Sequence, residues 1–147
     1  MIRGISIATP FGGGTVVARA GSVVYKDDYL NISDATETKS LGANEITQIY
    51  HCFMEDEIHH GEESFHILVV DERFVLIGPF VAGALGAIEA LIRAHPEIPV
   101  TRRLVRTVPY RYREAGVLGL RLFPVPGLKD GPISDLARFH FAYLGRS

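Results

Sequence analysis

Residues 79–95 read PFVAGALGAIEALIRAH, and this stretch predicts one long helix. Apolar side chains recur in it at three- and four-residue spacing, the period of a helix face: Val81, Leu85, Ile88, Leu91 and Ile92. Pro79 suits the first turn of a helix, and Pro96 cannot continue one. We therefore expect a helix over residues 79–95 whose apolar stripe packs on a sheet.

A second face of the predicted helix carries small residues, which let another backbone approach closely: Gly83, Ala87, Ala90 and Ala94. Packing of the helix on the sheet is the favoured arrangement. Contact with the same helix of a second copy is the alternative, and it would make the protein a homo-oligomer.

The chain before this helix alternates short β-branched and aromatic runs with turn residues. Residues 22–26 and 29–33 flank Asp27-Asp28, and residues 65–70 and 74–77 flank Asp71-Glu72-Arg73, so each pair predicts a hairpin. Further strands are expected at residues 5–9 and 15–19. Residues 46–54 fit a helical stripe as well as a strand, and their side-chain types favour the strand. The sequence thus predicts an α+β fold, with an antiparallel sheet of about six to eight strands packed by the helix.

The chain after the helix changes in composition. Residues 100–113 and 117–123 are Arg-rich and extended, and they predict a further hairpin around Glu114-Ala115-Gly116. Ser134 suits the N-cap of a short C-terminal helix, whose apolar face would hold Leu136, Phe139, His140 and Tyr143. We expect a single domain over residues 1–147, with a sheet-plus-helix core at 1–96 and a basic extension at 97–147.

The order of several antiparallel strands followed by a closing amphipathic helix resembles the pleckstrin-homology-like roll of small bacterial domains. This resemblance covers residues 1–96 and rests on element order. It implies a fold with no fixed catalytic residues, so no site residue is carried over from it.

Composition and charge narrow the function classes. A chain of 147 residues with 47% apolar residues suits one core, and the uncharged run over residues 74–88 is shorter than the roughly 20 residues of a membrane-spanning helix. We therefore expect no membrane association. The single cysteine, Cys52, cannot close an intramolecular disulfide, and the N-terminus lacks the pattern of an export signal. A cytoplasmic protein is expected.

Charge is unevenly distributed along the chain. Residues 1–91 hold five Lys/Arg against thirteen Asp/Glu, a net charge of −8, whereas residues 92–147 hold ten against four, a net charge of +6. Such asymmetry is typical of an anion-binding face, of an acidic face for a basic partner, or of two halves that attract each other.

The segment TRRLVRTVPYRYR, residues 101–113, interleaves arginine with tyrosine. In a strand, Tyr110 and Tyr112 would share one face while Arg111 and Arg113 share the other. Arginine forms bidentate pairs with carboxylates, and tyrosine supplies contact area at protein interfaces. The predicted partner-binding residues are therefore Arg102, Arg103, Arg106, Tyr110, Arg111, Tyr112 and Arg113. The same layout could stack bases and neutralise phosphates, so nucleic acid is an alternative partner.

A His- and Glu-rich segment over residues 51–66 is the other candidate site. His51 and His66 should lie near the same end of the sheet, with His59 and His60 on the loop between them, and imidazoles with carboxylates can bind zinc. No compact ligand motif is present, so the sequence predicts no metal and no cofactor. Cys52 is expected to be a buried structural thiol on the strand face opposite His51.

The preferred interpretation is a non-catalytic protein-binding or regulatory module that contacts a protein partner, or a second copy of itself, through its Arg/Tyr segment. A nucleic-acid-binding domain using the same segment is the first alternative. A metal-dependent enzyme at the His/Glu cluster is the second.

Overall fold

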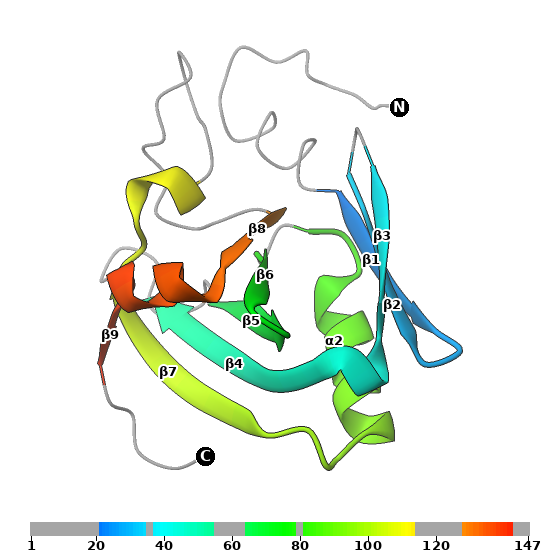
Figure 1. The fold of residues 1–147 in the computed structure, drawn as a ribbon. Coiled ribbons are helices and arrows are strands. Elements are labelled where there is room, and N and C mark those ends of the chain that lie inside the picture. The colour runs from blue at the N-terminus through cyan, green and yellow to red at the C-terminus, as the bar shows by residue number, and fades with distance from the viewer. Residues whose placement is uncertain (1–20, 35–36, 55–63, 79–80, 114–127, 143–147) are drawn as a thin grey trace.

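The computed structural model describes residues 21–34, 37–54, 64–78, 81–113 and 128–142, and their fold is α+β. A curled six-stranded sheet forms a half-barrel, and a smaller three-stranded sheet lies beside it, with the helix α2 between the two (Figure 1). The predicted strands at residues 5–9 and 15–19, and the predicted hairpin arm at 117–123, fall outside the described residues.

The smaller sheet is an antiparallel meander of three strands: β1 (Ser22–Lys26), β2 (Tyr29–Ser33) and β3 (Thr38–Gly42). Asp27 and Asp28 join β1 to β2, and both have positive φ angles, of 54° and 66°. Two left-handed residues in a row are the geometry of a tight hairpin turn, for which aspartate is one of the tolerated residues. The predicted first hairpin is confirmed.

The larger sheet has the spatial order β8-β6-β5-β4-β7-β9. Its strands are β4 (Ile46–Met54), β5 (Ser64–Val70), β6 (Arg73–Ile77), β7 (Val100–Thr107), β8 (Leu128–Pro132) and β9 (His140–Ala142). The strand interpretation of residues 46–54 and the β5–β6 hairpin are confirmed. A single antiparallel sheet was the wrong prediction, because β7 lies parallel to β4. The crossover through α2 carries the chain back so that β7 runs in the same direction as β4.

The helix α2 spans Ala84–Ala94, so it is shorter than the predicted 79–95. Gly83 has a left-handed φ of 76°, and a Cβ there would lie 2.6 Å from the Val23 carbonyl oxygen. Just before it, the Ala82 carbonyl accepts a hydrogen bond from the Val23 amide, and the Ala82 amide donates to Gly21. The chain therefore pairs with the edge of β1 before the helix begins.

The C-terminal part differs most from the prediction. Residues Tyr110–Tyr112 and Ile133–Arg138 are 3-10 segments, named η2 and η4, and the predicted α-helix at Ser134 is absent. His140 belongs to β9, which pairs with β7. The neighbours of β7 in the described sheet are therefore β4 and β9, so β7 is an interior strand rather than an arm of a separate Arg-rich hairpin.

Buried side chains form two clusters on opposite faces of the curled sheet. The first, which we call the aliphatic core, joins the smaller sheet, α2 and one face of the larger sheet. Its fully buried members include Leu30, Ile49, Leu68, Ile88 and Leu91. The second, which we call the aromatic core, consists of Cys52, Phe65, Ile67, Phe74, Leu76, Val105, Val108, Tyr112 and Phe139. Strand alternation explains the division, since successive residues of β4 and β5 point to opposite faces.

Candidate functional site

Strand β7 carries successive arginines on opposite faces of the sheet. Arg102 lies in register with His51, and its guanidinium carbon lies 4.9 Å from the ring centroid of Phe53. Arg103 lies on the other face, 5.6 Å from the ring centroid of Tyr50. The predicted partner-binding residues therefore do not form one continuous surface.

The two tyrosines of the Arg/Tyr segment have opposite environments. Tyr110 is 55% exposed, whereas Tyr112 is 2% exposed and belongs to the aromatic core. The predicted sharing of one face was wrong because the segment is a 3-10 turn, in which residues two apart point in different directions. Arg113 donates a hydrogen bond from Nε to the Val108 carbonyl at 2.8 Å, which ties the turn to the end of β7.

A buried carboxylate, Asp135, organises this end of the molecule. The Tyr112 hydroxyl donates to Asp135 Oδ2 at 2.5 Å. Burial, reinforced by this hydrogen bond, raises the pKa of Tyr112 to about 12, so the hydroxyl stays a donor at neutral pH. Asp135 also lies 3.4 Å from Arg111 Nη1 and 3.8 Å from Arg138 Nε. The carboxylate thus accepts a hydrogen bond from one tyrosine in the core and pairs with two arginines at the surface.

The contact of Asp135 with Tyr112 was not predicted from the sequence, because 23 residues separate the two. One feature of the sequence could have identified it. Acidic residues are scarce among the last 50 positions, which are rich in arginine, so each aspartate there is a candidate ion-pair partner. Pairing of two 3-10 segments, however, has no periodicity that sequence can reveal.

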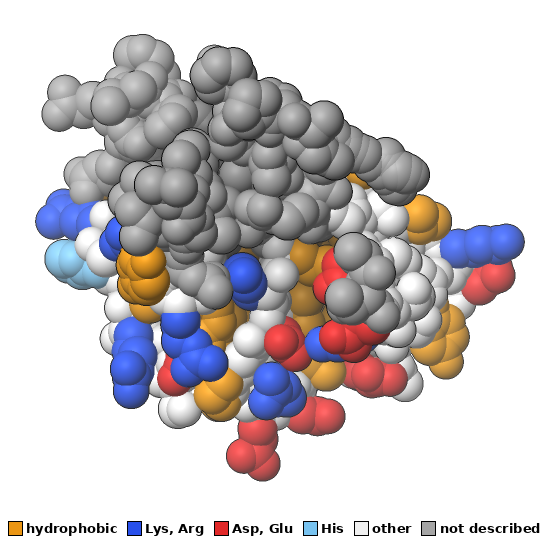
Figure 2. Space-filling view, turned by 90° about the horizontal axis from the view of Figure 1, so that it is seen from above, with side chains coloured by type: hydrophobic (Ala, Val, Ile, Leu, Met, Phe, Trp, Pro, Cys, Tyr) orange, Lys and Arg blue, Asp and Glu red, His pale blue; other side chains and the backbone are white. Residues whose placement is uncertain are grey.

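We define the basic end by four exposed residues of η2, η4 and the start of β9: Tyr110, Arg111, Arg138 and His140. Arg106, on β7, is also exposed. The side chains of Arg111 and Arg138 are 68% and 73% exposed. In Figure 2, most Lys and Arg side chains lie in the left half and most Asp and Glu side chains toward the bottom and right, while a Lys or Arg side chain projects at the right edge. On this face, the charge asymmetry of the sequence is therefore partly visible in space.

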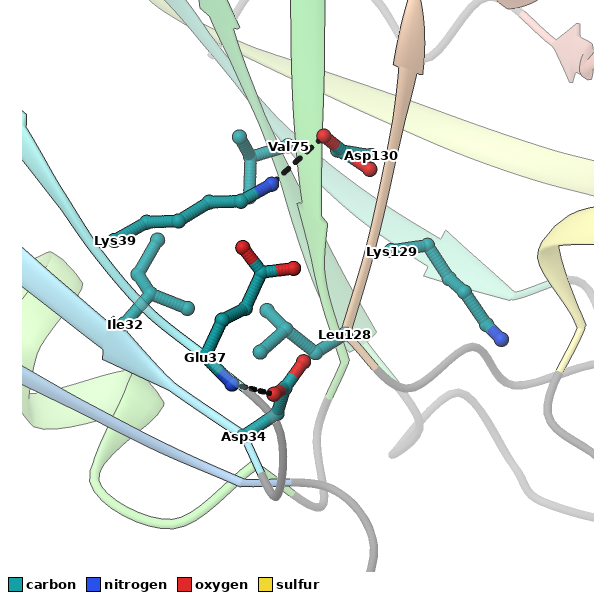
Figure 3. A pocket seen from close by; sticks show the side chains of 8 residues that line it. All are labelled: Ile32, Asp34, Glu37, Lys39, Val75, Leu128, Lys129 and Asp130. Carbon is teal, nitrogen blue, oxygen red and sulfur yellow. Dashed lines mark hydrogen bonds and ion pairs between the residues drawn. The ribbon is translucent and has the colours of Figure 1, made fainter.

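A small cavity of about 70 Å³ lies where the two sheets meet, between β3 and β8. Its apolar wall is formed by Ile32, Val75 and Leu128, and its rim is charged (Figure 3). Lys39 Nζ lies 2.9 Å from Asp130 Oδ2 across the opening, and Arg73 pairs with the same oxygen at 3.3 Å. The Lys39 hydrogen bond is the main cause of the lowered pKa of Asp130. The ion pair joins the two sheets, and the cavity contains none of the residues predicted to bind a partner.

The predicted proximity of His51 and His66 is confirmed. They are direct cross-strand partners, with stacked rings 4.4 Å apart at their centroids and 15° between planes. Burial is the main cause of the lowered pKa of both imidazoles, with Arg102 adding to the effect on His51, and the pKa of His66 falls to about 4. His59 and His60 lie outside the described residues. Among the residues that are described, no three metal-ligating side chains come together.

Cys52 lies on the face opposite His51, as predicted. It is fully buried in the aromatic core, and burial raises the pKa of its thiol. A thiol that remains protonated at neutral pH is a poor nucleophile, so this residue is a packing element of the core.

A second histidine site, not singled out from the sequence, lies at the end of α2. The His95 ring contacts two carboxylates at 3.1 Å each, through Nε2 to Asp28 and through Nδ1 to Glu97. The hydrogen bond to Asp28, followed by that to Glu97, raises the pKa of His95. This arrangement, the His95 clamp, joins the turn of the first hairpin to the end of the helix.

Comparisons of the chain with protein-family models, with characterised proteins and with solved structures give no match. The resemblance to a pleckstrin-homology-like roll therefore stays a prediction. None of the helices in the described residues has the length and apolar character needed to cross a membrane.

Proposed function

We propose that this protein is a non-catalytic protein-binding or regulatory module whose basic end contacts an acidic segment of a protein partner. The observation that carries the proposal is the buried Asp135 carboxylate, which holds Arg111 and Arg138 at the surface beside the exposed Tyr110. In this proposal the module acts in the cytoplasm, in keeping with its single buried thiol.

The geometry lowers the cost of binding an anion. Free arginine side chains lose rotamer freedom when they grip a partner, whereas Arg111 and Arg138 are already restrained by a shared carboxylate. Arg111 is further restrained because its guanidinium lies 5.3 Å from the ring centroid of Tyr112. The single Asp135 carboxylate is shared by two guanidinium groups. Carboxylates of a partner are suited to bidentate pairing with such guanidinium groups.

The described residues with nucleophilic or metal-binding chemistry give little support to an enzyme. The Cys52 thiol is inaccessible, and the pair of histidines lacks a neighbouring carboxylate among its strand partners. A pleckstrin-homology-like roll, which we retain as part of the proposal, also has no fixed catalytic residues.

The burial of Tyr112 favours a protein partner over nucleic acid. A single-strand binding surface usually stacks successive bases on exposed aromatic rings. The sequence analysis considered Tyr110 and Tyr112 as stacking residues. Tyr110 is exposed, but Tyr112 is buried and its hydroxyl donates a hydrogen bond to Asp135. Nucleic acid is therefore the competing outcome of the test.

Binding of two labelled probes, a deca-glutamate peptide and a 20-nucleotide oligo(dT), followed by fluorescence anisotropy tests the proposal. We expect the peptide to bind, and the double variant Arg111→Ala/Arg138→Ala to weaken its binding about tenfold or more. Arg93→Ala, which removes an exposed arginine of α2, is the matched control and should leave the affinity unchanged. Absence of peptide binding, or tighter binding of oligo(dT) that is lost in the same double variant, would reject the proposal.

A further inference from the structure

Three hydrogen-bond donors form a row across the middle of the larger sheet, on the face opposite the aromatic core. His66 on β5 lies in register with His51 on β4, and His51 lies in register with Arg102 on β7. The three strands are neighbours in the curled sheet (Figure 1). Residues in register on adjacent strands point to the same side, so the three side chains share one face.

His66 is the unusual member of the row. It is 7% exposed, and its ring stacks on that of His51. Within the described residues, neither of its ring nitrogens has a hydrogen-bond partner. Buried polar side chains nearly always have such a partner, and a neutral imidazole presents one N–H donor and one acceptor. The His66 ring therefore points to a polar ligand that satisfies it.

Among the described strand partners in the row, the charges favour an anion. Arg102 contributes to the lowered pKa of His51, and His51 contributes to that of His66, so the row is already positive at one end and resists further positive charge. The remaining strand partner in the row is Ile77, which pairs with His66 and carries no charge. A metal cation would be repelled by Arg102. An anion would offset the charge of Arg102 and accept hydrogen bonds from the imidazole N–H groups.

The exposure of the side chains decreases along the row from Arg102 to His66. Arg102 is exposed, His51 is half-buried, and His66 is buried. Phe53 supports the outer part, since its ring lies 4.4 Å from that of His51 and 4.9 Å from the Arg102 guanidinium carbon. A ligand would thus meet Arg102 first and reach the imidazoles at the inner end.

We propose that Arg102, His51 and His66 form a binding site for a phosphate group. Donors on three adjacent strands lie side by side on one face, and such a row suits the several oxygens of a tetrahedral oxyanion better than the two of a carboxylate. Guanidinium and imidazole N–H groups are both effective donors to phosphate. This site is separate from the basic end and does not depend on the function proposed for it.

Titration of the imidazole resonances by NMR, with inorganic phosphate and with glycerol 3-phosphate as probes, tests the site. We expect saturable shifts and a raised pKa of His51 when phosphate is bound, because the anion stabilises the imidazolium. Arg102→Gln should weaken binding at least about tenfold, since a charge-assisted pair is lost. Arg103→Gln is the matched control, because the adjacent arginine lies on the other face, and it should have no effect.

Binding of both probes would assign the site to phosphate esters, and binding of inorganic phosphate alone would assign it to the free ion. The same shifts in sodium chloride of equal ionic strength would overturn the proposal, as would equal weakening by Arg102→Gln and Arg103→Gln. His51→Gln provides a second variant and should also abolish the phosphate response. Stoichiometric zinc binding by the His51–His66 pair in phosphate-free buffer, strengthened by Arg102→Gln, would replace the anion site with a metal site.

Discussion

The aliphatic core and the aromatic core are both closed by a polar contact, but the two contacts differ in exposure. Beside the aliphatic core, the His95 clamp uses Asp28 and Glu97, whose side chains are 73% and 70% exposed. At the aromatic core, Tyr112 donates to Asp135, whose side chain is 10% exposed. Water can replace the partners of an exposed ion pair, whereas a buried donor that loses its acceptor stays unsatisfied. We therefore expect the buried contact to matter more for folding and the exposed one to respond more to pH.

The largest effect should come from a charge placed in the aliphatic core. Ile88 is fully buried between α2 and both sheets, so Ile88→Asp buries an unpaired carboxylate. We expect a loss of more than about 4 kcal/mol, enough to unfold most of the protein. Leu85→Asp is the matched control on the same helix, since Leu85 is 59% exposed and should tolerate the change. Equal melting temperatures for Ile88→Asp and the parent, measured by circular dichroism, would contradict the placement of α2 in the aliphatic core.

An intermediate effect is expected where the aromatic core meets β8. A Cβ at Gly131 would overlap the hydroxyl of Tyr112, and that ring is held by Asp135 and packed against Phe74 and Phe139. Gly131→Ala should therefore cost about 1–3 kcal/mol of unfolding free energy in a denaturant titration. The aromatic core would prove loosely packed if this variant were as stable as the parent.

Gly86→Ala is the matched control for that measurement. Gly86 lies within α2, and a Cβ there meets nothing within 4 Å. Alanine is favoured over glycine inside a helix by about 1 kcal/mol, so this variant should be more stable than the parent. A glycine-to-alanine substitution is thus expected to lower the free energy of unfolding at Gly131 and to raise it at Gly86.

The elements that sequence predicted are those stabilised by local patterns. Alternating runs and turn residues are enough for β1, β2, β5 and β6, and the presence of a helix follows from its periodicity. The helix was shorter than predicted, and its buried stripe was predicted only in part. Ile88 and Leu91 are buried as expected, but Leu85 is exposed, and Ala84 and Ala87 complete the buried face. A helix enclosed between two sheets needs small residues for close approach, and apolar spacing alone does not distinguish an alanine stripe from a leucine stripe.

The elements that sequence missed depend on contacts between distant residues. The parallel pairing of β4 with β7 joins positions about 50 residues apart, and no local pattern specifies it. Likewise, the environment of Tyr112 is set by Asp135 and Gly131, which come from later segments. Of the candidate site, the sequence analysis singled out Arg111 and the proximity of His51 to His66. It did not identify Arg138, and it did not show which arginines share a surface.

The smallest effect, and the most pH-dependent one, is expected at the His95 clamp. The pKa of His95 is raised in the folded protein by Asp28 and Glu97, so the folded state binds a proton more tightly than the unfolded state. Its stabilising contribution is fully present below the unfolded pKa of about 6.5, and it is lost as pH rises through the folded pKa. The lowered pKa values of His51 and His66 have the opposite effect on stability. The unfolded state binds protons more tightly at these two residues, so stability decreases as pH falls below about 6.5.

The two effects oppose each other in the parent protein, so the pH profile of the parent alone does not isolate the clamp. His95→Gln removes the clamp and leaves the other pair intact, and the difference in melting temperature between parent and variant therefore reports His95. We expect this difference to be largest near pH 5.5, where the imidazolium bridges both carboxylates, and to shrink by pH 9 as the proton is lost. Because Asp28 and Glu97 have lowered pKa values, both stay ionised over this range and do not contribute to the change. A difference that is constant from pH 5.5 to 9 would mean that His95 stabilises the fold through packing and not through its charge.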